Sequence, residues 1–135
     1  MGKDPPEYRS TQYIHTMINI SSSKASSLVW ELQKIQRCLD LSFLFKGEGE
    51  IWVKVTEAQD CIEEAVHEMN YAANAINEIA RAEAVAKCLK ALEFCDGAIT
   101  EALSVASPYH REQGALANLR AGRKAIIELH SSITK

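Results

Sequence analysis

The segment that decides the fold runs from residue 18 to residue 39 and reads INISSSKASSLVWELQKIQRCL. Its stripe positions recur at alternating intervals of three and four residues, which is the period of one face of an α-helix and not of a β-strand. The stripe extends back to residue 14, and its members are Ile14, Ile18, Ser21, Ala25, Leu28, Leu32, Ile35 and Leu39. This pattern predicts a long N-terminal helix from about Glu7 to Phe45.

The middle of this predicted helix is rich in serine, which is a weak helix former. We therefore expect the helix either to continue through Ser21–Ser27 or to kink or break there. After the helix, Lys46–Glu50 contains two glycines and predicts a loop.

Three further apolar stripes predict three further helices. The second comprises Val55, Ala58, Ile62, Ala65, Met69, Ala72 and Ile76. The third comprises Val85, Cys88, Leu89, Leu92, Cys95, Ile99, Leu103 and Ala106. The fourth comprises Leu116, Leu119, Gly122, Ile126, Leu129 and Ile133. Pro108 predicts the break before the fourth helix. The turn between the second and third helices is placed near Ile79–Ala82 by length alone.

Four helices with short connections predict an all-α fold, an antiparallel four-helix bundle with a long N-terminal helix. We expect a single domain over residues 1–135, with residues 1–6 disordered. Seventeen of the 18 alanines lie between Ala58 and Ala125, so helices two to four are expected to approach closely. A first helix that overhangs the others predicts an oligomer, most simply a twofold dimer.

Composition narrows the class of protein. The chain contains no apolar run near 18 residues, which argues against a membrane partner, and its polar N-terminus lacks the apolar stretch of a signal peptide. We therefore expect a cytoplasmic protein. The four cysteines form no Cys-x-x-Cys pair, so Cys88 and Cys95 are interpreted as small buried apolar residues. Residues 46–107 carry a net charge of −7 and residues 108–135 a net charge of +3, which favours self-association over contact with phosphate.

The Glu64-x-x-His67 spacing occurs in di-iron helical bundles and raises the question of a metal site. At about 100° per residue, His67 points almost opposite the stripe of its helix, and Glu64 also points away from it. An outward-facing pair predicts a solvated helical face. We therefore expect no bound metal and no cofactor.

A second set of carboxylates spans two helices. The segments DCIE (Asp60, Glu63, Glu64) and EFCD (Glu93, Asp96) resemble the paired acidic motifs of all-α nucleoside-triphosphate pyrophosphohydrolases. The resemblance implies that these carboxylates bind Mg²⁺ and the phosphates of a nucleotide, and clustered oxygens suit that ion. A magnesium-dependent enzyme is therefore one alternative.

Three titratable residues lie at the edge of the predicted core, where charge is costly unless it is paired. They are Asp96, Arg123 and His130. One interpretation is an Asp96–Arg123 ion pair between adjacent helices with His130 hydrogen-bonded nearby; the other is a polar pocket.

The segment RKAIIELH, from Arg123 to His130, resembles the Arg-then-His signature of HEPN-type helical domains, and AVAKCLKAL, residues 84–92, resembles their Lys-rich second motif. The resemblance implies an RNA-binding or RNA-cleaving bundle in which His130 transfers protons. Arg120 and Lys124 flank Arg123, and all three are candidate phosphate contacts.

Large side chains on outer faces suggest contacts between molecules. Trp30 points opposite the stripe of the first helix, Phe94 points away from the third stripe, and Phe45 ends a run of large residues. Trp is enriched at interfaces, so these three are candidate contacts to a second copy or a protein partner. The favoured hypothesis is a non-catalytic bundle that acts through assembly or partner binding, with the two enzymatic readings as alternatives.

Overall fold

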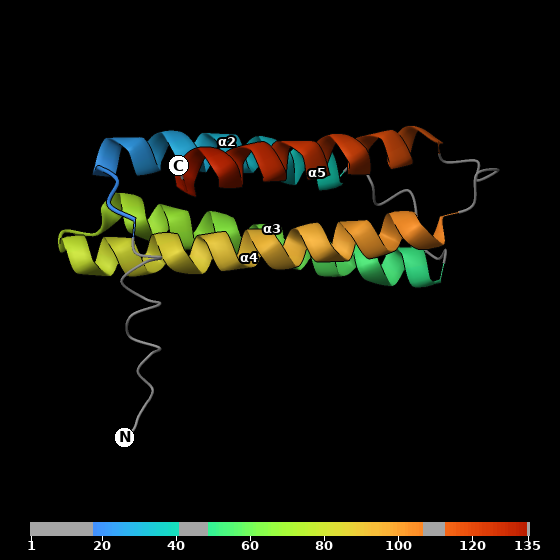
Figure 1. The fold of residues 1–135 in the computed structure, drawn as a ribbon, viewed down its shortest axis with the longest axis horizontal. Helices are drawn as coiled ribbons and strands as arrows, with labels where there is room; N and C mark the ends of the chain where they lie inside the picture. The colour runs from blue at the N-terminus through green and yellow to red at the C-terminus, as the bar shows by residue number, and fades with distance from the viewer. Residues whose placement is uncertain (1–17, 41–48, 107–112, 135) are drawn as a thin grey trace, which may run out of the picture.

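The structure, a computed structural model, describes residues 18–40, 49–106 and 113–134. The described helices are α2 (Ser22–Asp40), α3 (Glu50–Asn74), α4 (Glu78–Val105) and α5 (Gln113–Thr134). Each helix packs against two neighbours, in the ring order α2, α3, α4, α5. Successive helices run in opposite directions (Figure 1), so the predicted all-α antiparallel four-helix bundle is confirmed. Pro108 lies outside the described residues.

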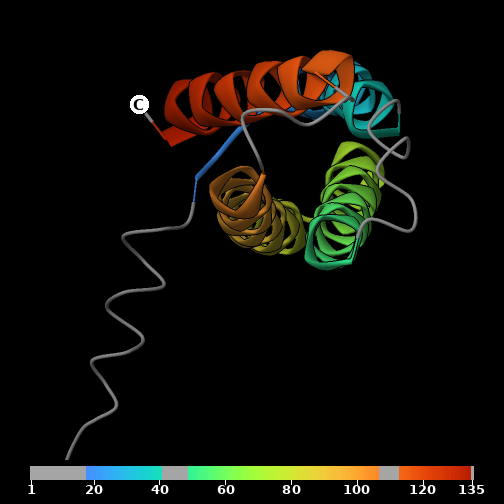
Figure 2. The ribbon, with the colours of Figure 1, turned by 90° about the vertical axis from the view of Figure 1, so that its right-hand side faces the viewer.

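The four helices form two layers. In the view of Figure 2, α2 and α5 lie together above α3 and α4, and α5 runs obliquely over α4. The contact between α3 and α4 is the most extensive in the bundle, and the contacts of α5 with α4 and α2 are the smallest of the four. The α2/α5 pair and the α3/α4 pair are called the upper and lower layers below.

Most of the predicted stripe positions form the core. Among those described, the fully or nearly fully buried positions include Leu32, Leu39, Val55, Ile62, Met69, Leu92, Ile99, Leu116 and Ile126. Leu103 and Leu129 are half-buried at the edge of this core. Ile76 is an exception, since 97% of its surface is exposed in the turn after α3. The 3.6-residue period therefore predicts most of the buried positions within the helices.

The N-terminal helix is shorter than predicted. Ile18–Ser21 is not helical, and α2 begins at Ser22. The Ser21 hydroxyl accepts a hydrogen bond from the Lys24 N–H at 3.0 Å, which caps the helix. The Ser22 hydroxyl donates to the Ala73 carbonyl at 2.7 Å and ties this end to α3. The break allowed at Ser21–Ser27 therefore falls at its first residue.

This correction removes one argument for a partner. The described α2 has 19 residues against 25 in α3 and 28 in α4, so it does not overhang the bundle within the described residues. Phe45, at the predicted end of that helix, lies outside the described residues. The proposal of an oligomer must therefore rest on the exposed surface.

The turn between α3 and α4 lies at residues 75–77, and the prediction of Ile79–Ala82 was wrong. The Asn77 side chain accepts hydrogen bonds from the N–H groups of Ile79 and Ala80, at 2.7 and 3.1 Å, and caps α4. Arg81 donates to the Ala75 carbonyl at 2.8 Å and holds the turn closed. A single capping asparagine decides this boundary, which no apolar period reveals.

Small residues allow α3 and α4 to lie close together. Ala58, Ala65 and Ala72 are buried at seven-residue intervals on α3. Cys88, Cys95 and Ala102 are buried at the same interval on α4. The Cys95 thiol donates to the Ala58 carbonyl at 3.3 Å, so a side chain of α4 reaches the backbone of α3. The close approach expected for the last three helices is thus found between α3 and α4, whereas the contact between α4 and α5 is much smaller.

Candidate functional site

The seam between α4 and α5 brings together the titratable residues singled out in the sequence. The Arg123 Nε donates to Asp96 Oδ1 at 2.8 Å. One to two helical turns away, His130 Nε2 lies 2.9 Å from Glu93 Oε2. Both pairs join α4 to α5. The interpretation of an interhelical Asp96–Arg123 ion pair with His130 hydrogen-bonded nearby is therefore confirmed.

The two pairs lie at the rim of the core and not inside it. The exposed fractions are 42% for the Arg123 side chain, 32% for Asp96, 29% for His130 and 64% for Glu93. Partly exposed pairs of this kind contribute at most about 1 kcal/mol each. Asp96, Glu93 and His130 line a shallow groove of about 410 Å³ together with Leu92, Ile126, Ile127, Ser131 and Thr134. Both pairs connect α5 to α4 at this rim.

Sequence reasoning missed Glu93 as the partner of His130. The sequence does contain a signal for this pair, because α4 and α5 are antiparallel. If Asp96 faces Arg123, then His130, seven residues after Arg123, should face a residue of α4 about seven positions before Asp96. Glu93 is the acidic residue nearest to that point in the sequence.

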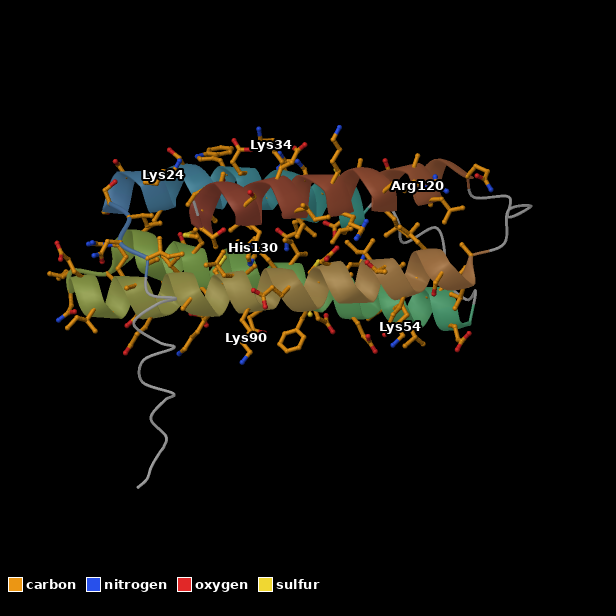
Figure 3. The ribbon with its side chains drawn as sticks, viewed as in Figure 1. Lys24, Lys34, Lys54, Lys90, Arg120 and His130 are labelled. Carbon is orange, nitrogen blue, oxygen red and sulfur yellow. The ribbon has the colours of Figure 1, made fainter. Side chains whose placement is uncertain are left out.

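A second groove on the same seam is basic. It has a volume of about 500 Å³ and is lined by Arg120, Arg123 and Lys124 with Glu128 and the apolar Leu103 and Ile127. The three cations predicted as phosphate contacts therefore do lie together. Lys90, from the Lys-rich segment of the RNA-related resemblance, projects from the lower layer on the side away from α5 (Figure 3).

The carboxylates of the magnesium alternative are brought together only in part, since Asp60 and Glu93 line one groove between α3 and α4. Glu64 and His67 are exposed on α3, whereas Glu93 and Asp96 bond to α5. Among the residues that the structure describes, no group of three or more His, Cys, Asp or Glu side chains could hold a metal ion. The predicted outward direction of Glu64 and His67 is confirmed.

The buried cysteines of α4 have thiols of low reactivity. Burial raises the pKa of the Cys88 thiol to about 12 and that of Cys95 still further. Burial also raises the pKa of the half-buried Cys61 thiol on α3, with smaller contributions from the charges of Glu64, Asp60 and Glu57. A thiol with a raised pKa carries little thiolate near neutral pH, so none of these three is an activated nucleophile.

The lower layer carries a third groove on its outer face, between α3 and α4. Its volume is about 460 Å³, and its lining residues are Glu57, Asp60, Cys61, Glu93, Phe94, Gly97, Ala98 and Glu101. Lys54 bonds to Glu101 at 2.8 Å and to Glu57 at 3.4 Å. These bonds, chiefly the one to Glu101, raise the pKa of Lys54. The groove thus holds four carboxylates beside a single lysine.

Two aromatic side chains predicted to face outward are exposed. Trp30 on α2 is 66% exposed and Phe94 on α4 is 61% exposed. Because α2 and α4 are diagonal in the ring of helices, their outer faces point to opposite sides of the bundle. Each layer therefore presents an exposed aromatic residue, and the lower layer also exposes Tyr71 and Trp52 on α3.

Comparison of the chain with protein-family models, curated proteins and solved structures found no match. Within the described parts of the chain, none of the helices is long and apolar enough to cross a membrane.

Proposed function

We propose that this protein is a non-catalytic helical bundle that acts by assembly, with copies of itself or with a partner protein. The observation that carries the proposal is Trp30, whose indole is 66% exposed on the side of α2 opposite the buried stripe. The buried stripe already anchors α2 in the bundle, so the exposed indole adds nothing to the core and lowers the solubility of the protein. Trp is enriched among the residues that contribute most to binding at protein interfaces. We place this function in the cytoplasm, where thiols such as Cys88 stay reduced.

Light scattering over a range of protein concentrations tests this proposal. The purified chain is expected to form a stable oligomer, and Trp30→Asp is expected to dissociate it. Tyr71→Asp is the matched control, because Tyr71 is an aromatic residue 57% exposed on α3, outside α2. A wild-type chain that remains a monomer at high concentration and captures no partner through Trp30 contradicts the proposal.

The basic groove supports a second candidate function, RNA binding or cleavage. Arg120, Arg123 and Lys124 converge on one groove, and the carboxylate of Glu93 orients His130 on the same seam. Cations that neutralise phosphates bind RNA in a salt-dependent manner. Gel-shift and cleavage assays with single-stranded RNA check this candidate: His130→Ala is expected to abolish cleavage, and Arg120→Ala with Lys124→Ala to weaken binding. Unchanged binding and cleavage in these variants removes it.

A further inference from the structure

The two layers of the bundle carry opposite charge. The helices of the lower layer, α3 and α4, contain 11 acidic and four basic side chains, a formal net charge of −7. The helices of the upper layer, α2 and α5, contain three acidic and six basic side chains, a net charge of +3. Opposite potentials on opposite faces of one molecule attract the unlike faces of two copies.

The outer groove of the lower layer has the shape and the charge to receive an aromatic side chain. Phe94 forms one wall, and Gly97 and Ala98 contribute small residues between the carboxylates. No heavy atom outside the helix lies within 4 Å of the position that a Cβ of Gly97 would occupy, so the surface at this residue is open. Lys90 projects from the same side of the layer (Figure 3), one turn before Phe94, so the excess of negative charge lies towards Glu101.

The outer face of α2 carries the complementary groups. Lys34 and Arg37 follow Trp30 by four and seven residues, so they lie along the same side of the helix. Lys34 projects from the upper layer on the side away from α3 and α4 (Figure 3), although it also bonds to Glu31 at 3.3 Å. This face therefore presents an indole followed by two cations.

The spacing of the two sets matches. Arg37 lies seven residues after Trp30, and Glu101 lies seven residues after Phe94. Seven residues of helix correspond to about 10 Å in both cases. Since α2 and α4 run in the same direction (Figure 1), two copies stacked in the same orientation place α2 of one parallel to α4 of the next.

We propose that the partner of the Trp30 face is the lower layer of a second copy of this chain. Trp30 inserts beside Phe94 over Gly97 and Ala98, and Lys34 and Arg37 meet the carboxylates of Glu57, Asp60 and Glu101. This inference rests on the proposed function and deepens it, because it names the partner and both of its surfaces.

The geometry has a consequence for the assembly. The two surfaces point to opposite sides of the bundle, so one copy cannot exchange both contacts with the same neighbour. The interface is heterologous, and repeating it adds copies without closing a pair. The assembly therefore grows with concentration, in contrast to the twofold dimer expected from sequence, and it weakens with salt because its charged groups are exposed.

Two variants, each blocking one surface, test the inference. Trp30→Asp blocks the α2 face, and Gly97→Leu fills the groove. Gly97→Leu is expected to remain folded, because the site is open and leucine is the better helix former. Each variant alone is expected to be a monomer, with association weakened by roughly tenfold or more. An equimolar mixture is expected to stop at twice 15.0 kDa, since each copy retains one working surface.

The outcomes separate the inference from the proposed function. If the Trp30→Asp variant is monomeric while the Gly97→Leu variant assembles as the wild-type chain does, the groove is not the surface that receives Trp30. Assembly through Trp30 then stands, and the inference falls. If the mixture of variants stays monomeric, the inference also falls. If the wild-type chain is monomeric by sedimentation at high concentration and low salt, self-assembly itself is excluded and the inference falls with it.

A charge exchange tests the register independently. Arg37→Glu and Glu101→Arg are each expected to weaken association, and their combination in one chain to restore it. Urea unfolding of each variant serves as the control for folding, since Glu101 also bonds to Lys54. Failure of the combined variant to recover, with folding intact, overturns the proposed contact between these two residues.

Discussion

The two layers of the bundle solve the same packing problem with different residues. In α3 and α4, eight of the 18 buried residues are alanine, and the helices lie close enough for a thiol of one to reach a carbonyl of the other. In α2 and α5, two of the 11 buried residues are alanine, and the core is filled by leucine and isoleucine. The lower layer therefore depends on close backbone approach, and the upper layer on large side chains covering it.

This difference predicts that added volume is harmful in the lower layer. Ala65 is fully buried on α3, seven residues after Ala58, whose carbonyl accepts the hydrogen bond from Cys95 of α4. Ala65→Leu is expected to lower the free energy of unfolding by about 1–3 kcal/mol through overpacking. Ala117→Leu on the exposed face of α5 is the matched control, with an expected change near zero. Urea denaturation measures both, and equal effects would contradict the proposed close seam.

The thiols buried in the lower layer predict that the free energy of unfolding falls at alkaline pH. In the unfolded chain a cysteine titrates with a pKa near 9.0, whereas burial holds the pKa of Cys88 at about 12. Between these values the unfolded state binds fewer protons than the folded state, so stability falls as pH rises. The stabilisation is fully present below pH 9 and is lost towards pH 12, at up to about 1.4 kcal/mol per pH unit for each such thiol.

Denaturation at several pH values between 8 and 11 checks this slope. Cys88→Ala removes one titrating group and is expected to make the decline shallower, even though it lowers stability at neutral pH. The same decline in Cys88→Ala as in the wild-type chain would show that other groups cause it.

The two layers also differ at their glycines. The position of a Cβ at Gly97 on α4 is open, whereas at Gly122 on α5 it would lie 3.0 Å from Cδ2 of the fully buried Leu39. Gly97→Ala is expected to raise the free energy of unfolding by about 1 kcal/mol through helix propensity. Gly122→Ala gains the same propensity but forces Leu39 to move, so a net loss is expected. Thermal melts of the pair test the contrast, and equal gains would show that α2 and α5 are loosely packed.

The apolar period predicted the elements and most of the core, because burial in a bundle follows helix geometry directly. It placed Leu32, Ile62 and Leu92 correctly. It failed at Ile76 and at the start of α2. At each place a single polar side chain accepts a hydrogen bond from a backbone N–H and fixes where a helix begins: Asn77 at the start of α4 and Ser21 at the start of α2. Such caps depend on one residue and leave no mark on the period.

The candidate sites were predicted in part, for a related reason. The Asp96–Arg123 pair follows from the register of two adjacent antiparallel helices. The outer groove at Gly97 does not, because it depends on how far α3 and α4 approach each other. The charge difference between the layers required knowledge of which helices share a layer, since the sequence places α2 and α5 at opposite ends of the chain.

The smallest effect is expected at the seam where the layers meet. Asp96 and Arg123 are about one-third and two-fifths exposed, so water and salt screen their attraction. A double-mutant cycle with Asp96→Ala and Arg123→Ala is expected to give a coupling energy of about 0.2–1 kcal/mol, falling towards zero in 1 M salt. Guanidinium cannot serve as denaturant here because it is itself a salt, so urea is required.

A coupling energy above about 2 kcal/mol would place the pair among the main supports of α5, whose contacts with its neighbours are the smallest in the bundle. The two layers would then be joined by charge as much as by the apolar core.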